Sequence, residues 1–114
     1  MKITYVHSER AAAIRKLNDR FRMQRRGGFY RLSGRVFALA HQPYEEVQNA
    51  IRSYDGFDHN NPLDKHDCGT IELHGETYVW EIVYFGKGGC GESPDPCNPA
   101  VTMRCMTISL RSEQ

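Results

Sequence analysis

The chain lacks the features that mark several large classes of protein. No apolar run in its 114 residues approaches the ~18 residues that a membrane-spanning helix needs. The opening residues, MKITYVHSER, lack the apolar segment of a secretory signal. We therefore expect a cytoplasmic location and no membrane partner. The composition, 39% hydrophobic and 11% aromatic, excludes a disordered chain and predicts a single domain over residues 1–114.

Cysteine is scarce, and its spacing is wrong for the common thiol sites. The four cysteines are Cys68, Cys90, Cys97 and Cys105, and no two of them have the C-x-x-C spacing of a zinc or redox site. Free thiols are the main expectation. Cys90 and Cys97 fall in one predicted loop, so a disulfide or a metal clip between them stays an alternative.

Acidic residues are nearly missing from the first third of the chain. Residues 1–36 carry ten Lys or Arg against two Asp or Glu, a net charge of +8. Residues 37–114 carry five against twelve, a net charge of −7. Two interpretations follow: one end of the molecule meets an electrostatic partner, or the two halves neutralise each other on folding.

The basic third contains a predicted helix over residues 8–25, with Ser8 as its N-cap. Its apolar stripe consists of Ile14, Leu17 and Phe21. Gly27 and Gly28 are expected to end the helix. The pattern is that of a helix with one face packed on a core.

At about 100° per residue, Arg15, Arg22 and Arg26 project to one flank of that stripe, with Lys16 and Asp19 further round. Exposed arginines held in this way suit an acidic protein groove or a phosphate backbone. Asp19 lies one turn from both Arg15 and Arg22 and can pair with either.

The rest of the chain predicts a small sheet and a second helix. The predicted elements are a strand at 35–41, a helix at 43–54, a loop at 55–66, and strands at 68–74, 77–85 and 101–110. Gly75-Glu76 marks a tight hairpin. The order α-β-α-β-β-β predicts an α+β fold: a small antiparallel meander sheet with two helices packed on one face.

The stretch KHDCGT places His66, Asp67 and Cys68 side by side, the residue types of cysteine hydrolases. Successive side chains of a strand point to opposite faces, so these three cannot act together from one strand. His66 and Cys68 would instead share a face with Thr70 and later alternate residues. We expect no catalytic residue here.

A metal site is the other possible use of this region. The available ligands are His59, His66 and His74 with Asp58, Asp64 and Asp67. These types suit zinc or iron, but their spacing matches no metal motif with a known mechanism. We expect no metal and no cofactor.

The loop GKGGCGESPDPCNPA has no nucleotide-binding signature, since it lacks the G-K-[ST] ending and no helix pattern follows it. Loops of this length in a small domain are uncommon unless they have a function. Asp95, between two prolines, is expected in a stiff turn. The loop either locks the sheet edge or binds a partner.

Several motifs together resemble the family called domain of unknown function 3768. They are IRKLND (14–19), GRV (34–36), VQNAIRSYDGF (47–57), HDCG (66–69), YVWEIVYF (78–85) and SPDPCNPAVTMRCMTI (93–108). The resemblance implies one α+β domain, no established activity, and a setting on plasmids, prophages and other mobile elements. Cys68, Cys97 and Cys105 stand where the family pattern has other residues, which argues against thiol chemistry.

Three functional hypotheses remain. The first is a non-enzymatic protein-binding module, such as an inhibitor of a host nucleoprotein defence complex of the CRISPR type. The second is a nucleic-acid-binding accessory protein that uses the basic helix, with only weak binding to free duplex DNA. The third, a small metal-dependent enzyme, would use His66, Asp67 and Asp95. For the first, the expected contact residues are Arg15, Lys16, Arg22, Arg26, Asp67 and Asp95.

Overall fold

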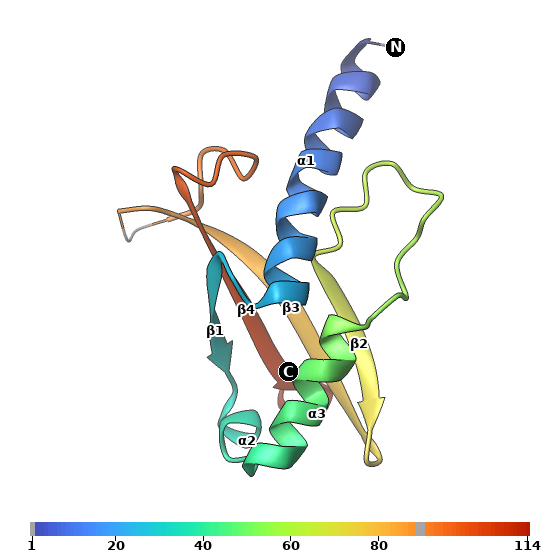
Figure 1. Ribbon diagram of the computed structural model, residues 1–114, viewed down its shortest axis with the longest axis vertical. Coiled ribbons are helices and arrows are strands. Elements are labelled where there is room, and N and C mark those ends of the chain that lie inside the picture. Colours follow the sequence, from blue (N-terminus) through green and yellow to red (C-terminus); the bar gives the residue numbers. More distant parts are fainter. Residues whose placement is uncertain (1, 89–90) are drawn as a thin grey trace.

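The structure is a computed structural model that describes residues 2–88 and 91–114. Its elements are α1 (Lys2–Gln24), β1 (Gly28–Leu32), α2 (Gly34–Phe37), α3 (His41–Arg52), β2 (Cys68–Leu73), β3 (Glu76–Gly86), β4 (Thr102–Leu110) and the 3-10 helix η1 (Arg111–Glu113). The four strands form one sheet, and α1 and α3 lie on the same face of it (Figure 1). The predicted α+β fold with its helices on one face is confirmed.

The sheet is mixed rather than purely antiparallel. Its strand order is β1-β4-β3-β2, and β2, β3 and β4 form the predicted antiparallel meander. β1 adds to β4 in parallel, with Gly28 opposite Arg104. The β2–β3 turn consists of His74 and Gly75, one residue earlier than predicted, and their φ values of 52° and 76° are those of a type I′ hairpin turn.

The strand predicted at 35–41 is wrong. The first strand lies earlier, at Gly28–Leu32, and residues 34–37 form the short helix α2. The Ser33 hydroxyl accepts a hydrogen bond from the Val36 amide at 3.3 Å, and this cap starts a helical turn where the apolar residues indicate a strand. Val36 still reaches the core.

The helices otherwise follow the sequence pattern. α1 begins before Ser8, so the predicted N-cap is wrong, but it ends before the two glycines as expected, with Arg25 at φ 56° and Gly27 at φ 95°. α3 starts two residues before the predicted position and keeps Pro43 in its first turn. Among the described residues, no helix combines the length and apolar character that crossing a membrane requires.

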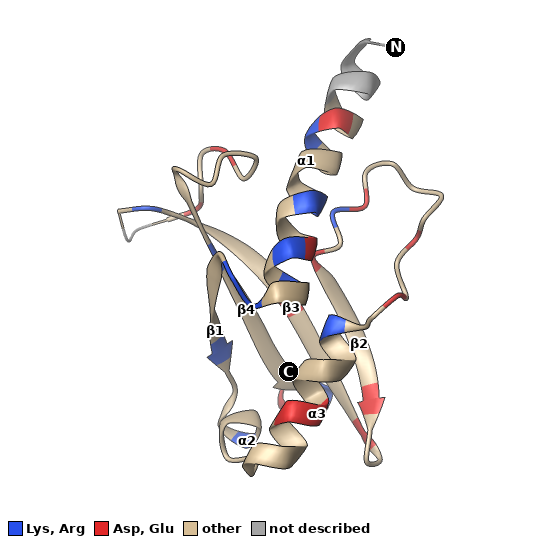
Figure 2. Ribbon diagram, viewed as in Figure 1, with Lys and Arg blue, Asp and Glu red and all other residues tan. Residues whose placement is uncertain are grey.

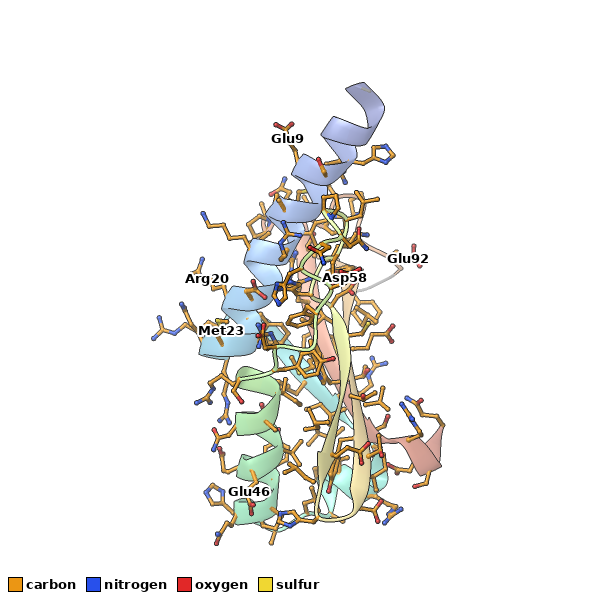
Figure 3. All side chains as sticks on the ribbon, turned by 90° about the vertical axis from the view of Figure 1, so that its right-hand side faces the viewer. Glu9, Arg20, Met23, Glu46, Asp58 and Glu92 are labelled. Carbon is orange, nitrogen blue, oxygen red and sulfur yellow. The ribbon has the colours of Figure 1, made fainter. Side chains whose placement is uncertain are left out.

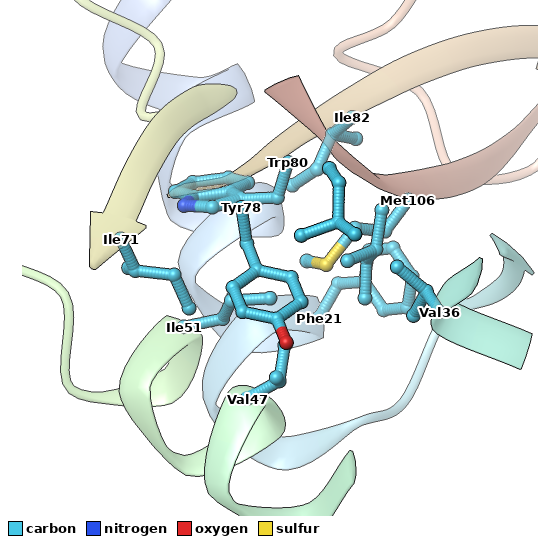
Figure 4. Packing of buried hydrophobic residues seen from close by; sticks show 11 residues of the cluster. Phe21, Val36, Val47, Ile51, Ile71, Tyr78, Trp80, Ile82 and Met106 are labelled. Carbon is cyan, nitrogen blue, oxygen red and sulfur yellow. The ribbon is translucent and has the colours of Figure 1, made fainter. Parts of the chain in front are cut away.

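The core lies between the two long helices and the sheet (Figure 4). Its members include Phe21 from α1, Val47 and Ile51 from α3, Ile71 from β2, Tyr78, Trp80 and Ile82 from β3, and Met106, Ile108 and Leu110 from β4. Gly28 permits the close approach of β1, since a Cβ there would lie 2.7 Å from the Phe21 ring and 2.6 Å from the Arg104 carbonyl oxygen.

The thiols divide between core and surface. Cys105 is buried. Cys68 is exposed, because it lies at the start of an edge strand and alternates away from the buried residue Ile71. Cys97 is a free thiol. Cys90 lies outside the described residues, so the alternative of a bridge between Cys90 and Cys97 stays a prediction.

Candidate functional site

The predicted contact residues do not form one surface. Of the four on or just after α1, Lys16 and Arg26 are exposed, Arg15 is half-buried and Arg22 is buried. The expectation of one exposed arginine flank is therefore wrong.

Arg22 is buried because it closes the end of the neighbouring helix. Its Nη1 donates to the carbonyl oxygens of Ile51 at 3.0 Å and Arg52 at 2.7 Å, which lie in the last turn of α3. Its Nη2 pairs with Asp19 at 3.2 Å, one of the two pairings expected for that carboxylate. Arg22 thus caps the Arg52 carbonyl oxygen and adds a second hydrogen bond to the Ile51 carbonyl oxygen, which also accepts from the Tyr54 amide at 3.2 Å. Its burial removes it from any contact surface.

Arg15 and His66 hold the long loop after α3 against α1. Arg15 donates to the Asp64 carbonyl oxygen at 2.6 Å, and His66 Nδ1 lies 2.9 Å from Asp19 Oδ1. The His66 ring also stacks on Phe57, with centroids 3.8 Å apart. His66 has φ 55°, supported by a hydrogen bond from its amide to Asp64 Oδ1.

This left-handed turn places the His66 ring against α1. Strand alternation predicts that His66 shares a face with Cys68 and Thr70. This prediction is therefore wrong.

A second set of side chains, which we call the Asn18 group, joins α1 to the sheet; it consists of Asn18, Asp67, Tyr84 and Arg104. Its Nδ2 donates to the Tyr84 hydroxyl at 2.7 Å and to the Lys65 carbonyl oxygen at 3.0 Å. The Tyr84 hydroxyl in turn donates to Asp67 Oδ2 at 3.2 Å. Burial, with the nearby Asp67 carboxylate, raises the pKa of Tyr84 well above its ordinary value, so the hydroxyl stays protonated and serves as a donor.

Arg104 completes this group. Its Nε donates to Asn18 Oδ1 at 2.8 Å, its Nη2 donates to the Pro96 carbonyl oxygen at 2.6 Å, and its guanidinium lies 5.2 Å from the Tyr84 ring centroid. Burial lowers the pKa of Arg104, although the group stays cationic at any ordinary pH. None of the described carboxylates pairs with it.

Asp95 anchors the long loop between β3 and β4. It forms an ion pair with Arg10 of α1 at 3.3 Å and accepts the Cys97 amide at 3.2 Å. The Thr102 hydroxyl donates to the Asp95 carbonyl oxygen at 2.8 Å. These contacts hold the loop against α1 and the start of β4, a central strand of the sheet, rather than against a sheet edge. Contact of Asp67 or Asp95 with a partner stays a prediction.

The geometry favours a structural role for the residues that a small metal-dependent enzyme would use. His66, Asp67 and Asp95 each bind a different side chain, namely Asp19, Tyr84 and Arg10. Within the described residues, no group of three or more His, Cys, Asp or Glu is placed to hold a metal ion.

Of the three candidate histidines, His59 and His66 lie near each other, with ring centroids 6.0 Å apart, but each pairs with a carboxylate of its own. His59 contacts Asp55 at 2.9 Å and His74 contacts Glu46 at 3.0 Å, so each of these rings has its own carboxylate. Burial, followed by the Asp67 charge, raises the pKa of the Cys68 thiol, which disfavours the thiolate needed for nucleophilic attack.

The side of α1 turned away from the sheet carries a different kind of surface. We define the outer face of α1 as Lys16, Arg20 and Met23, all exposed, with Arg20 and Met23 projecting away from the sheet in Figure 3. Figure 2 shows basic residues along this helix and acidic residues on α3, β2 and the loop between them. Arg20 and Met23 were not among the residues selected from the sequence, although both follow Lys16 at helical spacing.

A pocket of about 500 Å³ lies beside this face, where α1 ends against β1 and β4. We call it the basic pocket. Its lining residues are Leu17, Arg20, Arg26, Gly27, Gly28, Phe29, Lys87, Pro99, Thr102, Met103 and Arg104. No sequence motif indicates it, because its walls come from three segments that meet only in the folded chain.

The comparisons with known proteins place the chain in a family. The family described as "Protein of unknown function (DUF3768)" matches residues 32–113. The chain belongs to this family. The match runs from the end of β1 through η1 and contains Asp67, Asp95 and Arg104, whereas α1 lies outside it. No curated protein and no solved structure matches the chain.

Proposed function

We propose that this DUF3768 protein is a non-enzymatic protein-binding module that holds an acidic protein against the outer face of α1. The observation that carries the proposal is a contrast among the cations of the basic third. Arg10, Arg22, Arg25 and Arg35 each pair with a carboxylate of the chain. Within the described residues, Lys16, Arg20 and Arg26 form no such pair. Neither do the half-buried Arg15, which donates to a backbone carbonyl oxygen, and the exposed Arg31 of β1, which lies over the Phe85 ring.

The paired cations account for part of the charge asymmetry. Arg10–Asp95, Arg25–Glu45 and Arg35–Glu76 each join the basic third to the acidic remainder, as expected if the two halves neutralise each other. The exposed cations without a carboxylate partner are therefore a surplus that folding leaves on the surface, and three of them, Lys16, Arg20 and Arg26, lie on or just after α1. A surplus of one sign attracts a partner of the other sign and orients it during association.

Met23 favours a protein over a nucleic acid as that partner. It is 50% exposed and lies one turn after Arg20 on the same helix face. Methionine and arginine are enriched at the centres of protein interfaces, where an apolar side chain fills a small cavity and charges surround it. A phosphate backbone offers no such cavity. The partner's membership of a nucleoprotein defence complex, and the cytoplasmic location of the encounter, stay predictions.

The test is site-specific photocrosslinking followed by a quantitative binding measurement. A crosslinking residue is placed at Met23 and, as a control, at the exposed Glu72 of β2. A protein captured only from Met23 is purified, and its affinity is measured by calorimetry for the wild type and for Lys16→Glu/Met23→Ser. Charge reversal and loss of the apolar anchor should together weaken binding at least about tenfold. Arg111→Glu, an exposed reversal in η1, should leave the affinity unchanged.

Three results would contradict the proposal. The same proteins could be captured from both positions, or the double variant could bind as tightly as the wild type. The captured protein could also be a second copy of the chain, which would make the outer face a homodimer interface. Tight binding to duplex DNA, with a log–log salt slope near ~0.9 per phosphate neutralised, would instead support the nucleic-acid hypothesis.

A further inference from the structure

The basic pocket has the size and composition of a ligand site. Its volume of about 500 Å³ falls within the ~300–1,000 Å³ typical of small-molecule pockets. Four of its lining residues are cationic, namely Arg20, Arg26, Lys87 and Arg104, and none is Asp or Glu. Such a concentration of one charge in a concave surface focuses the electrostatic potential on whatever enters it.

Arg104 shows that this charge lacks a counterion. The residue is 3% exposed, and its hydrogen bonds go to an amide oxygen of Asn18 and a carbonyl oxygen of Pro96, both neutral. A buried guanidinium is normally compensated by a carboxylate, because removing its charge from water costs far more than neutral acceptors return. An anion in the pocket would supply the missing charge.

One wall of the pocket is apolar. Phe29 and Met103 are each 38% exposed, and Leu17 and Pro99 also line the pocket. Phe29 and Met103 also line a smaller hollow that contains Arg31 and Phe85. Exposed aromatic and thioether groups beside cations suit a flat ring whose edge carries an anionic group.

We propose that the basic pocket binds a phosphate monoester that carries an aromatic ring, a ligand of nucleotide size. The phosphate contacts Arg104 and the exposed cations Arg26 and Lys87, and the ring lies on Phe29 and Met103. A phosphate fits better than a carboxylate because it brings nearly two charges and three acceptor oxygens to a site with four cations. The same chemistry is offered by a free nucleotide and by the phosphorylated end of a nucleic-acid strand.

Titration calorimetry of the whole protein tests the proposal. The probes are adenosine 5′-monophosphate, inorganic phosphate, adenosine, and a single-stranded hexanucleotide with and without a 5′-phosphate. We expect the monophosphate to bind and to raise Tm, inorganic phosphate to bind more weakly, and adenosine not to bind. The hexanucleotide should bind only when it carries the 5′-phosphate. A hexanucleotide affinity well above that of the mononucleotide identifies a strand end as the source, and similar affinities identify a free nucleotide.

Two exposed positions separate the contributions of charge and ring. Lys87→Glu should lower the affinity for both the mononucleotide and inorganic phosphate at least tenfold. Phe29→Ala should lower the affinity for the mononucleotide several-fold. It should leave the affinity for inorganic phosphate unchanged, since phosphate has no ring to stack. Arg111→Glu serves as the matched reversal outside the pocket and should change neither affinity. Circular dichroism spectra equal to that of the wild type show that each variant is folded.

The proposal is overturned if the mononucleotide fails to bind at 10 mM, or if Lys87→Glu and Phe29→Ala both bind as the wild type does. It is also overturned if a glutamate-rich peptide competes as well as the mononucleotide. Lys87 and Phe29 lie off the outer face of α1, and the probes are purified small molecules. Failure here therefore leaves the protein-partner proposal untouched, and the converse also holds.

Discussion

Arg22 and Arg104 are equally buried and differ in what surrounds them. Each is 3% exposed. Arg22 has a carboxylate, Asp19, and the carbonyl oxygens at the end of α3. Arg104 has only neutral acceptors, and it also lines a pocket that contains three other cations. Burial alone therefore does not tell a structural arginine from one available to a ligand.

The difference lies in where the compensating charge comes from. For Arg22 the chain supplies a carboxylate, so the guanidinium charge is compensated once the protein folds. For Arg104 the chain supplies only neutral hydrogen-bond acceptors, and in our proposal an external anion supplies the compensating charge. The two arginines also differ in their relation to the family, because the DUF3768 match includes Arg104 and excludes α1 with Arg22. The family part of the chain thus contains the buried cation that lacks a counterion.

The comparison is tested most directly by replacing each arginine with methionine. Arg22→Met should lower the free energy of unfolding by about 3–5 kcal/mol, because it removes the hydrogen bonds from a buried guanidinium to the end of α3 and one of the two partners of Asp19, the other being His66. Arg104→Met should cost only about 1–2 kcal/mol, because the loss of two neutral hydrogen bonds is offset by removal of an uncompensated charge. Urea unfolding followed by circular dichroism measures both.

Equal losses for the two variants would remove the distinction between them. The exposed Arg20→Met is the control for losing a cation on α1 and should stay within about 0.5 kcal/mol of the wild type.

Two tyrosines allow a smaller test on the Arg104 side. Tyr84→Phe removes the hydroxyl that accepts from Asn18 and donates to Asp67, and should cost about 1–2 kcal/mol. Tyr30 is the matched control, because its buried hydroxyl has no hydrogen-bond partner among the described residues. Tyr30→Phe should therefore be neutral or stabilising by up to about 1 kcal/mol. A larger loss for Tyr30→Phe than for Tyr84→Phe would show that the Asn18 group contributes little.

Local patterns in the sequence predicted most of the elements. Alternation and β-branched content identified β2, β3 and β4 to within one or two residues, and helical spacing identified α1 and α3. β1 was missed because GFYRL is short, begins at the second of two adjacent glycines, and pairs with a strand more than seventy residues later. α2 was missed because the Ser33 cap starts a helical turn in a segment whose continuous apolar run, residues 36–40, indicated a strand.

The candidate sites depended on contacts that no local pattern contains. Arg22 falls on the buried side of α1 by its spacing from Asn18, but its charge suggested solvent. What buries it is the end of α3, about thirty residues away. Similarly, the sequence shows Arg104 only as one polar residue within a predicted strand. The pocket that it lines is formed by α1, β1 and the loop that contains Pro99, which no local pattern brings together. Charge counts did predict a basic surplus, although not which cations would remain unpaired.

A third arginine extends the comparison to an exposed pair with the smallest expected effect. Arg25 Nη2 lies 2.9 Å from Glu45 Oε2, and both side chains are about one-third exposed (31% and 34%). The hydrogen bond from Arg25 lowers the pKa of Glu45 below its usual 4.5, with His41 and Arg52 adding smaller effects in the same direction. A carboxyl whose pKa is lowered by folding stabilises the folded state above its unfolded-state pKa and stops doing so as the pH falls through the folded value.

Glu45→Gln should therefore be slightly less stable than the wild type at pH 7, and the difference should disappear as the pH falls through the lowered folded-state pKa of Glu45. Urea midpoints measured from pH 7 to pH 3 give this difference directly. Arg25→Gln should lose the same pH-dependent part, because either change breaks the same pair. A difference that persists unchanged at pH 3 would mean that Glu45 acts through packing rather than charge. The Arg25 pair would then no longer be a weaker, exposed counterpart of the carboxylate that compensates Arg22.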